Sequence, residues 1–155
     1  SHPQPGAHQP HLEFLVNISD YGALQYTQML VGIVSPPSTM YIALAYDEPT
    51  PGGDASDLVE PVDATGYMRK SIATADWSLV SSDIAAVTND DTYTWTATTN
   101  WEPVRFVVLC TSVGTDKVYA WTEVEPLAPL IGQSYILDSA SMVMSVSGPS
   151  EEVTL

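Results

Sequence analysis

Residues 103–111 (PVRFVVLCT) constrain the fold of this chain more than any other segment. From Val104 to Cys110 the side chains are almost all apolar, and β-branched and aromatic types dominate. A strand with one face in water alternates apolar and polar residues. This segment is apolar at odd and even positions alike, and it is too short for a typical helix. It is therefore predicted to be a central strand of a sheet that is covered on both faces.

Several shorter segments have the composition of strands that would surround the central one. Residues 92–98 (TYTWTAT) alternate most clearly, with aromatic side chains on one face and threonines on the other. In residues 117–125 (KVYAWTEVE) the same alternation places Tyr119 and Trp121 on the face of Glu123, so these two are the best candidates for exposed aromatic residues. The other predicted strands are 40–46, 67–73, 77–80, 133–137 and 141–146.

The one predicted helix lies within residues 12–34. Asn17 or Ser19 is a suitable N-cap, apolar side chains follow at helical spacing, and Pro36 and Pro37 end the segment. Many short strands and little helix are typical of a mainly β protein. The fold class expected is an antiparallel β-sandwich, Ig-like or jelly-roll-like, with one short N-terminal helix.

The length of 155 residues predicts one domain with its own core. We expect an extended N-terminal arm over residues 1–11, a β-sandwich domain over residues 12–147 and an acidic C-terminal tail over residues 148–155. The arm contains all three histidines, His2, His8 and His11, with three prolines. It is expected to be a frayed terminus or a segment that becomes ordered on a neighbouring subunit.

The charge of the chain disfavours two classes of partner. Four Lys and Arg face nineteen Asp and Glu, which gives a formal net charge of −15. Such a chain repels phosphate backbones and anionic lipid, so neither nucleic acid nor a membrane surface is an expected partner. The polar first residues lack the apolar segment of a signal peptide, and no apolar stretch has the length of a membrane span. We expect a soluble protein that is made in the cytoplasm.

The sequence contains no recognisable catalytic pattern, and we predict that the protein is not an enzyme. A nucleophile needs a nearby base, and every histidine lies in the arm. The single cysteine, Cys110, sits in the apolar segment, where a thiol is expected to act as a small hydrophobe. Glu123 and Glu125 share a strand face and are expected to be solvated. No metal-type cluster or phosphate-binding loop is present, so no cofactor is predicted.

Residues 47–64 form a long acidic loop without a basic residue. Loops of this length are usually functional or mobile. Asp54, Asp57 and Glu60 are candidates for docking on a basic patch of a partner. Calcium binding by the carboxylates of this loop, or by residues 89–91, is an alternative, although neither segment has the ligand spacing of a known cation loop, and a solvated loop is the simpler interpretation.

Four segments together resemble a known family. They are residues 35–50 (SPPSTMYIALAYDEPT), 64–72 (ATGYMRKSI), 89–101 (NDDTYTWTATTNW) and 118–137 (VYAWTEVEPLAPLIGQSYIL). Across residues 19–146 the chain is similar to small tail-fibre-like or decoration (minor structural) proteins of tailed bacteriophages. The resemblance implies a β-sandwich on the exterior of a virion, bound to a capsid or tail protein. It also implies a homo-oligomer or lattice array, and it carries over no catalytic residue.

Two non-catalytic functions follow from the resemblance and from the surface residues. The first is an exterior decoration or cement protein on the capsid, or a closely similar tail accessory, which binds through its arm and loops. The alternative is a carbohydrate-binding, receptor-recognition module of a tail fibre. Tyr119 and Trp121 are expected to form an inter-subunit contact first, and a stacking platform for a glycan second. A small hydrolase is the third and weakest hypothesis. The candidate partner-binding residues are His2, His8, His11, Asp54, Asp57, Glu60, Tyr119 and Trp121.

Overall fold

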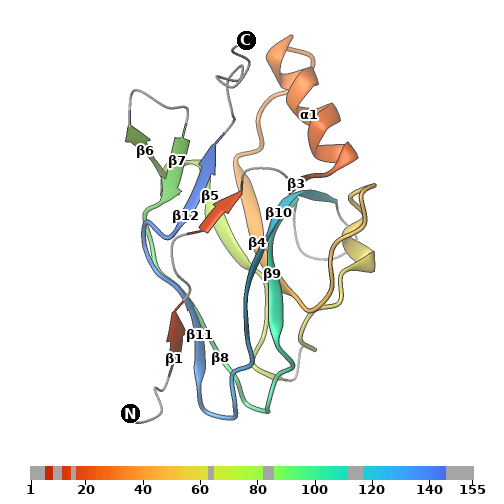
Figure 1. Cartoon of the computed structure of the whole chain (residues 1–155). Helices are drawn as coiled ribbons and strands as arrows, with labels where there is room; N and C mark the ends of the chain where they lie inside the picture. Colours follow the sequence, from red (N-terminus) through yellow and green to blue (C-terminus); the bar gives the residue numbers. More distant parts are fainter. Residues whose placement is uncertain are drawn as a thin grey trace, which may run out of the picture.

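The protein is mainly β with one α-helix. The computed structural model describes residues 6–8, 12–14, 17–62, 65–81, 86–111 and 117–145. Within that part of the chain the strands form three sheets, and the helix stands at one end of the molecule (Figure 1). The strand pairs are antiparallel except where two short N-terminal strands join an edge. The predicted mainly β, antiparallel fold with one helix is confirmed.

The largest sheet has five strands and forms one layer. Its pairs β10–β9, β9–β4 and β4–β5 are antiparallel, and β9 lies in the middle. In spatial order its strands are β3 (Asn17–Ile18), β10 (Val118–Leu127), β9 (Val104–Cys110), β4 (Thr39–Ala45) and β5 (Lys70–Ala73).

The two smaller sheets form the opposite layer as one interrupted ribbon. Strands β7 and β8 follow one another in the chain, and so do β11 and β12. They pair as β7–β12 and β8–β11. These strands are β7 (Ala86–Asn89), β8 (Tyr93–Thr96), β11 (Ser134–Leu137) and β12 (Met142–Ser145). The edges are formed by β6 (Trp77–Ser81) beside β7, by β1 (Gly6–His8) beside β11 and by β2 (Leu12–Phe14) beside β12.

The interruption of the ribbon is organised by the buried side chain of Asn89. Its Nδ2 donates to the carbonyl oxygens of Asp91 at 2.7 Å and Asp138 at 2.9 Å. Its Oδ1 accepts from the backbone N–H of Met142 at 2.9 Å. One amide side chain therefore satisfies backbone groups that the broken ladders leave unpaired.

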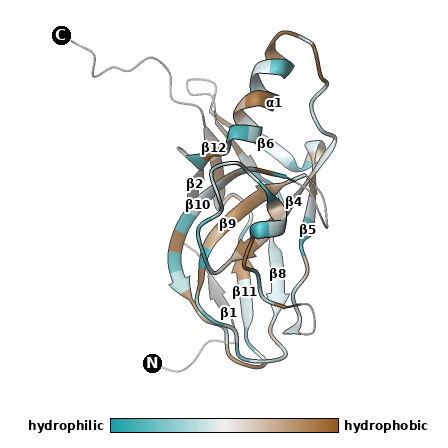
Figure 2. Ribbon diagram, turned by 90° about the vertical axis from the view of Figure 1, so that its right-hand side faces the viewer, coloured by the Kyte–Doolittle hydropathy of each residue, from teal (hydrophilic) through white to brown (hydrophobic). Residues whose placement is uncertain are grey.

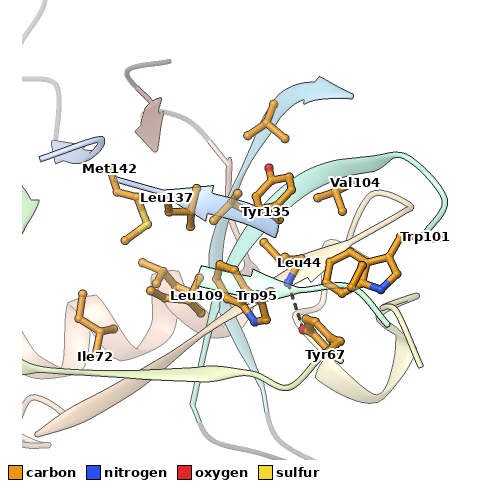
Figure 3. Close-up of a cluster of buried hydrophobic side chains, with 14 residues drawn as sticks. Leu44, Tyr67, Ile72, Trp95, Trp101, Val104, Leu109, Tyr135, Leu137 and Met142 are labelled. Carbon is orange, nitrogen blue, oxygen red and sulfur yellow. Dashed lines mark hydrogen bonds between the residues drawn. The ribbon is translucent and has the colours of Figure 1, made fainter. Parts of the chain in front are cut away.

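The main core lies between the two layers (Figure 3). Trp95 and Tyr135 from the ribbon meet edge to face, with ring centroids 6.2 Å apart. The indole Nε1 of Trp95 donates to the carbonyl oxygen of Met68 at 2.6 Å. On the side of the larger sheet, Ile42 and Leu109 complete the cluster with no exposed area. The alternation predicted for residues 92–98 is confirmed, because Trp95 is buried between the exposed Thr94 and Thr96.

The central strand β9 is covered on both faces, as its apolar sequence predicted. Val107 and Leu109 belong to the core between the layers. Phe106, Val108 and Cys110 point to the other face and pack in a second cluster with Trp121. The cover on that face includes Ala55 and Leu58 from the long acidic loop, around the short 3-10 helix η1 (Ala55–Asp57). Part of the loop is therefore a structural cover.

The predicted helix is confirmed as α1 (Asp20–Leu30). Ser19 is its N-cap, and the hydroxyl oxygen accepts from the backbone N–H of Gly22 at 2.9 Å. Asp20 lies in the first turn, where a negative charge is favourable. The helix ends well before Pro36 and Pro37, and Gly32 with a φ of +78° follows its C-cap.

Three details differ from the sequence-based expectations. Strand β5 begins at Lys70, because Tyr67 turns its side chain into the core and leaves the ladder. Strand β7 was not predicted, since Ala86–Asn89 has no clear alternation. Within the extended arm expected over residues 1–11, as a frayed terminus or a segment ordered on a neighbouring subunit, Gly6–His8 pairs in parallel with Ser134–Ile136 of its own chain. These three residues contain no proline, so each can take part in the ladder.

Candidate interaction surfaces

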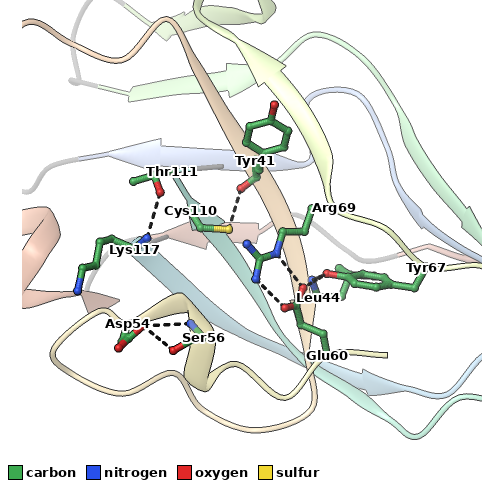
Figure 4. A network of polar contacts seen from close by, with 10 residues as sticks. All are labelled: Tyr41, Leu44, Asp54, Ser56, Glu60, Tyr67, Arg69, Cys110, Thr111 and Lys117. Carbon is green, nitrogen blue, oxygen red and sulfur yellow. Dashed lines mark hydrogen bonds and ion pairs between the residues drawn. The ribbon is translucent and has the colours of Figure 1, made fainter. Parts of the chain in front are cut away.

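The acidic loop is fixed to the body of the protein by an ion pair (Figure 4). Both carboxylate oxygens of Glu60 accept from Arg69, at 3.0 Å from Nε and 2.7 Å from Nη2. The Tyr67 hydroxyl also donates to Glu60, and it accepts from the backbone N–H of Leu44 at 3.1 Å. Only 17% of the Glu60 side chain is exposed. Glu60 thus holds the loop in place, and its predicted role in partner docking is not favoured by this position.

Burial and charge change the acidity of the groups in this network. The pKa of Tyr67 is raised well above its usual value, first because the phenol is buried and then because Glu60 lies beside it. Hydrogen bonds to Glu60 raise the pKa of Arg69, which stays a cation. A neutral phenol and a charged pair are therefore the stable forms at neutral pH.

The other two predicted acidic residues occupy different positions. Asp54 caps η1, where its Oδ1 accepts from the backbone N–H and the hydroxyl of Ser56 at 3.1 and 2.8 Å. These hydrogen bonds lower the pKa of Asp54. Asp57 is exposed, as are Asp47 and Glu48 earlier in the loop. The surface of the loop is therefore acidic even though Glu60 faces inward.

Among the described residues, no three His, Cys, Asp or Glu side chains come together in a way that could hold a metal ion. Cys110 is buried, and its Sγ lies 3.6 Å from the carbonyl oxygen of Tyr41. This is the position predicted for a thiol that packs as a small hydrophobe. His8 belongs to β1, whereas His2 and His11 lie outside the described residues.

The predicted exposed aromatic pair is not a flat exposed platform. Trp121 is 5% exposed and packs with Val118 and Phe106, so the prediction that it is exposed is wrong. The reason is that Trp121 lies opposite Val108 of β9, on the face that Ala55 and Leu58 of the acidic loop help to cover, whereas Glu123 on the same face is exposed. Tyr119 is half-buried against Tyr21 of α1, with ring centroids 5.7 Å apart, and burial raises its pKa.

Gly22 allows α1 to approach β10 closely. A Cβ atom at this position would lie 2.2 Å from the carbonyl oxygen of Tyr119. The neighbouring Ser19 donates its backbone N–H to the same oxygen at 3.0 Å and its hydroxyl to the carbonyl oxygen of Val118. The first turn of the helix is therefore fixed to β10. Glycine is a poor helix former, and sequence reasoning did not find this contact.

An apolar groove of about 300 Å³ lies beside α1. The helix contributes Tyr26 and Met29 to its lining. The rest of the lining comes from segments that are far apart in the sequence, including Pro36, Met40, Ile72, Trp77, Tyr119 and Met144. No charged residue is among the lining residues. Sequence reasoning did not find this groove, because no single segment carries its pattern.

The second half of α1 and the residues after it are rich in apolar residues, coloured brown in Figure 2, and several of their large side chains are exposed. Leu30 and Ile33 are each 68% exposed, and Val31 is 71% exposed. An exposed apolar patch of several side chains is typical of an interaction site. The groove and this end of the helix thus form one candidate surface, and the acidic loop forms another.

Comparison with protein families identifies the chain. The model of the family described as Podophage GP4 fiber I protein gp80 matches residues 17–128, which is more than half of the chain. Comparison with curated proteins finds no match. No helix in the described part of the chain is long and apolar enough to cross a membrane. The chain belongs to the Podophage GP4 fiber I protein gp80 family, which makes it a structural, tail-fibre-related protein of a bacteriophage virion, as its resemblance to tail-fibre-like proteins predicted.

Proposed function

We propose that this protein is a non-catalytic accessory subunit of the tail, which attaches to another virion protein and provides a rigid β body on the virion exterior. The fibre description of the family favours the tail over the capsid-decoration placement that the sequence left open. A body with an extensive core and two distinct surface patches suits a structural module. The observation that carries most weight is the burial of the aromatic residues that the alternative function requires.

The alternative function is receptor recognition through a sugar-stacking platform. Trp95, Trp101 and Trp121 are each at most 5% exposed. Trp77 is half-buried at the edge of the groove. A platform for a sugar ring needs an exposed aromatic face, and no tryptophan of this chain supplies one. Glycan binding through Trp121 is therefore not favoured by the geometry.

Attachment through the acidic loop is supported by charge and exposure. Asp47, Glu48 and Asp57 are exposed on a loop that η1 and the Glu60–Arg69 pair hold in place. A preformed acidic surface loses little entropy on binding and attracts a basic patch on a partner. The partner proposed is a virion protein with Lys and Arg side chains at the docking position.

Electron microscopy of particles with and without the chain tests the placement. Particles without it are expected to lose density at the tail, and their heads should retain DNA on heating as well as complete particles do. Missing density on the head lattice together with earlier DNA release would contradict the tail placement and support a capsid cement protein. Bound sugar in a glycan screen, lost on Trp121→Ala substitution in a folded protein, would support receptor recognition.

A pair of charge reversals tests the docking surface. Asp57→Lys is expected to weaken retention of the chain on particles. The difference in retention between the wild type and this variant should become smaller as the salt concentration is raised. Glu123→Lys is the matched control, because Glu123 is also exposed but lies on β10. Equal losses from both substitutions would mean that net charge, and not the loop, determines attachment.

A further inference from the structure

Residues 21–46 contain no charged side chain, although the whole chain has a net charge of −15. This interval begins directly after Asp20 and ends directly before Asp47. It includes α1 after its charged first residue, Asp20, the turn that follows the helix and strand β4. An uncharged buried strand is ordinary, but an exposed helix on an acidic protein is expected to carry charges on its solvent face.

Helix α1 obtains little stabilisation from its own chain. It has 11 residues, and Gly22 is its one buried residue. Isolated helices of this length are marginal in water, so most of their stability must come from packing. The side chains of Leu24 and Leu30 are exposed instead of packed. The apolar face of α1 is therefore suited to packing against a second molecule.

We propose that α1 and the groove beside it form a self-association surface, and that the occupant is a second copy of this chain. In a two-fold interface each patch faces the same patch of the other copy, so a charge within it would be brought close to a like charge. Between two molecules that each carry −15, only an uncharged surface avoids added repulsion. A basic partner, in contrast, would be recognised by carboxylates, which the acidic loop has and this surface lacks.

The size of the groove limits how the two copies meet. A stable interface covers about 800 Å² on each partner. A groove with a volume of about 300 Å³ has room for only a few side chains, so its walls alone do not provide an interface of that area. The exposed end of α1 must therefore take part. The flexible side chains of Met29, Met40 and Met144 line the groove and can adapt to an inserted apolar residue. Leu30 and Ile33 of the second copy are the residues suited to enter it.

Sedimentation of the full chain over a range of concentrations tests the proposal with two matched substitutions. Ile33 and Ile131 are both 68% exposed, but Ile131 lies in the turn between β10 and β11, at the opposite end of the molecule from α1 (Figure 1). Ile33→Asp is expected to weaken association by about tenfold or more. Ile131→Asp adds the same charge and should leave association unchanged.

Two results would overturn the proposal. One is a wild-type chain that stays monomeric at every concentration, and the other is an equal effect of the two substitutions. If the wild type is monomeric but Ile33→Asp is lost from particles, the occupant is a different virion protein. The proposal does not rest on the acidic loop: if Asp57→Lys leaves retention on particles unchanged while Ile33→Asp still weakens self-association, only the proposed attachment through the loop is contradicted. Urea unfolding midpoints of both variants show that each remains folded.

Discussion

Strand β9 and helix α1 have opposite relations to the rest of the chain. In β9 every residue except Arg105 is buried, and clusters cover both faces. In α1 one residue is buried, and the contact with β10 is concentrated in the first turn. Both segments are rich in apolar residues, and neither contains an acidic residue apart from Asp20 at the start of α1. The comparison indicates that the apolar side chains of β9 form the core, whereas those of α1 are available to contact a partner.

The largest effect is expected in the core that β9 supports. Trp95→Ala removes a side chain that is 1% exposed, together with its contact with Tyr135 and its hydrogen bond to Met68. The free energy of unfolding should decrease by about 3–5 kcal/mol, because the cavity cannot collapse in a well-packed site. Urea denaturation measures the change. A decrease of less than about 1 kcal/mol, close to the effect of a surface substitution, would mean that the two layers are not tightly packed.

The next effect concerns the attachment of α1. Gly22→Ala places a Cβ against the carbonyl oxygen of Tyr119 and should destabilise the chain by about 1–3 kcal/mol. Gly52→Ala is the control, because nothing lies within 4 Å of a Cβ at that position. Hydrogen exchange should show faster exchange in α1 and unchanged protection in β9. Faster exchange throughout the chain would show that the helix and the core are one cooperative unit.

A smaller effect is expected at alkaline pH, from the network that holds the acidic loop. The folded-state pKa of Tyr67 is raised, so the unfolded chain releases this proton near pH 10 while the folded chain keeps it. Stability is therefore greatest below pH 10 and decreases above it, by up to about 1.4 kcal/mol per pH unit for this group.

Tyr67→Phe measures the share of Tyr67 in that decrease. The substitution lowers stability at pH 8, because the hydrogen bonds to Glu60 and Leu44 are lost. Its urea midpoint should then change less steeply between pH 10 and 12 than that of the wild type. The pKa of Tyr93 is raised to about 12 by burial and then by Asp76, so part of the pH dependence remains. Identical slopes in the two proteins would contradict a buried neutral phenol at position 67.

The smallest effect is expected at the N-cap of α1. Ser19→Ala removes the hydroxyl that accepts from Gly22 and donates to Val118, at a cost of about 1 kcal/mol. Ser139→Ala, at an exposed position, is the control. Thermal unfolding followed by circular dichroism compares the two. An unchanged melting temperature for Ser19→Ala would mean that backbone contacts alone fix the first turn.

Local patterns predicted the parts of the fold that local patterns determine. The uninterrupted apolar segment identified β9, and Ser19 before Asp20 identified the start of α1. Trp121 was assigned to an exposed face because alternation cannot show that the acidic loop covers part of this face, onto which the register shift beside Tyr119 also brings Val118.

The candidate surfaces depended more on contacts between distant residues. The acidic loop was predicted, but the inward position of Glu60 depends on Arg69, which lies beyond the loop. The role of Gly22 was not predicted, because its close approach to Tyr119 is not visible in local sequence. The groove combines residues as distant as Tyr26 and Met144, so no periodicity of one segment could reveal it.

Hydrogen exchange at low and high protein concentration tests the contrast between β9 and α1 most directly. The amides of β9 are expected to have the same protection at both concentrations, because its partners belong to the same chain. Protection of the α1 amides should increase at the higher concentration, and Ile33→Asp should remove the increase while Ile131→Asp retains it. Protection of α1 that is independent of concentration in the wild type would contradict a helix that is presented for self-association.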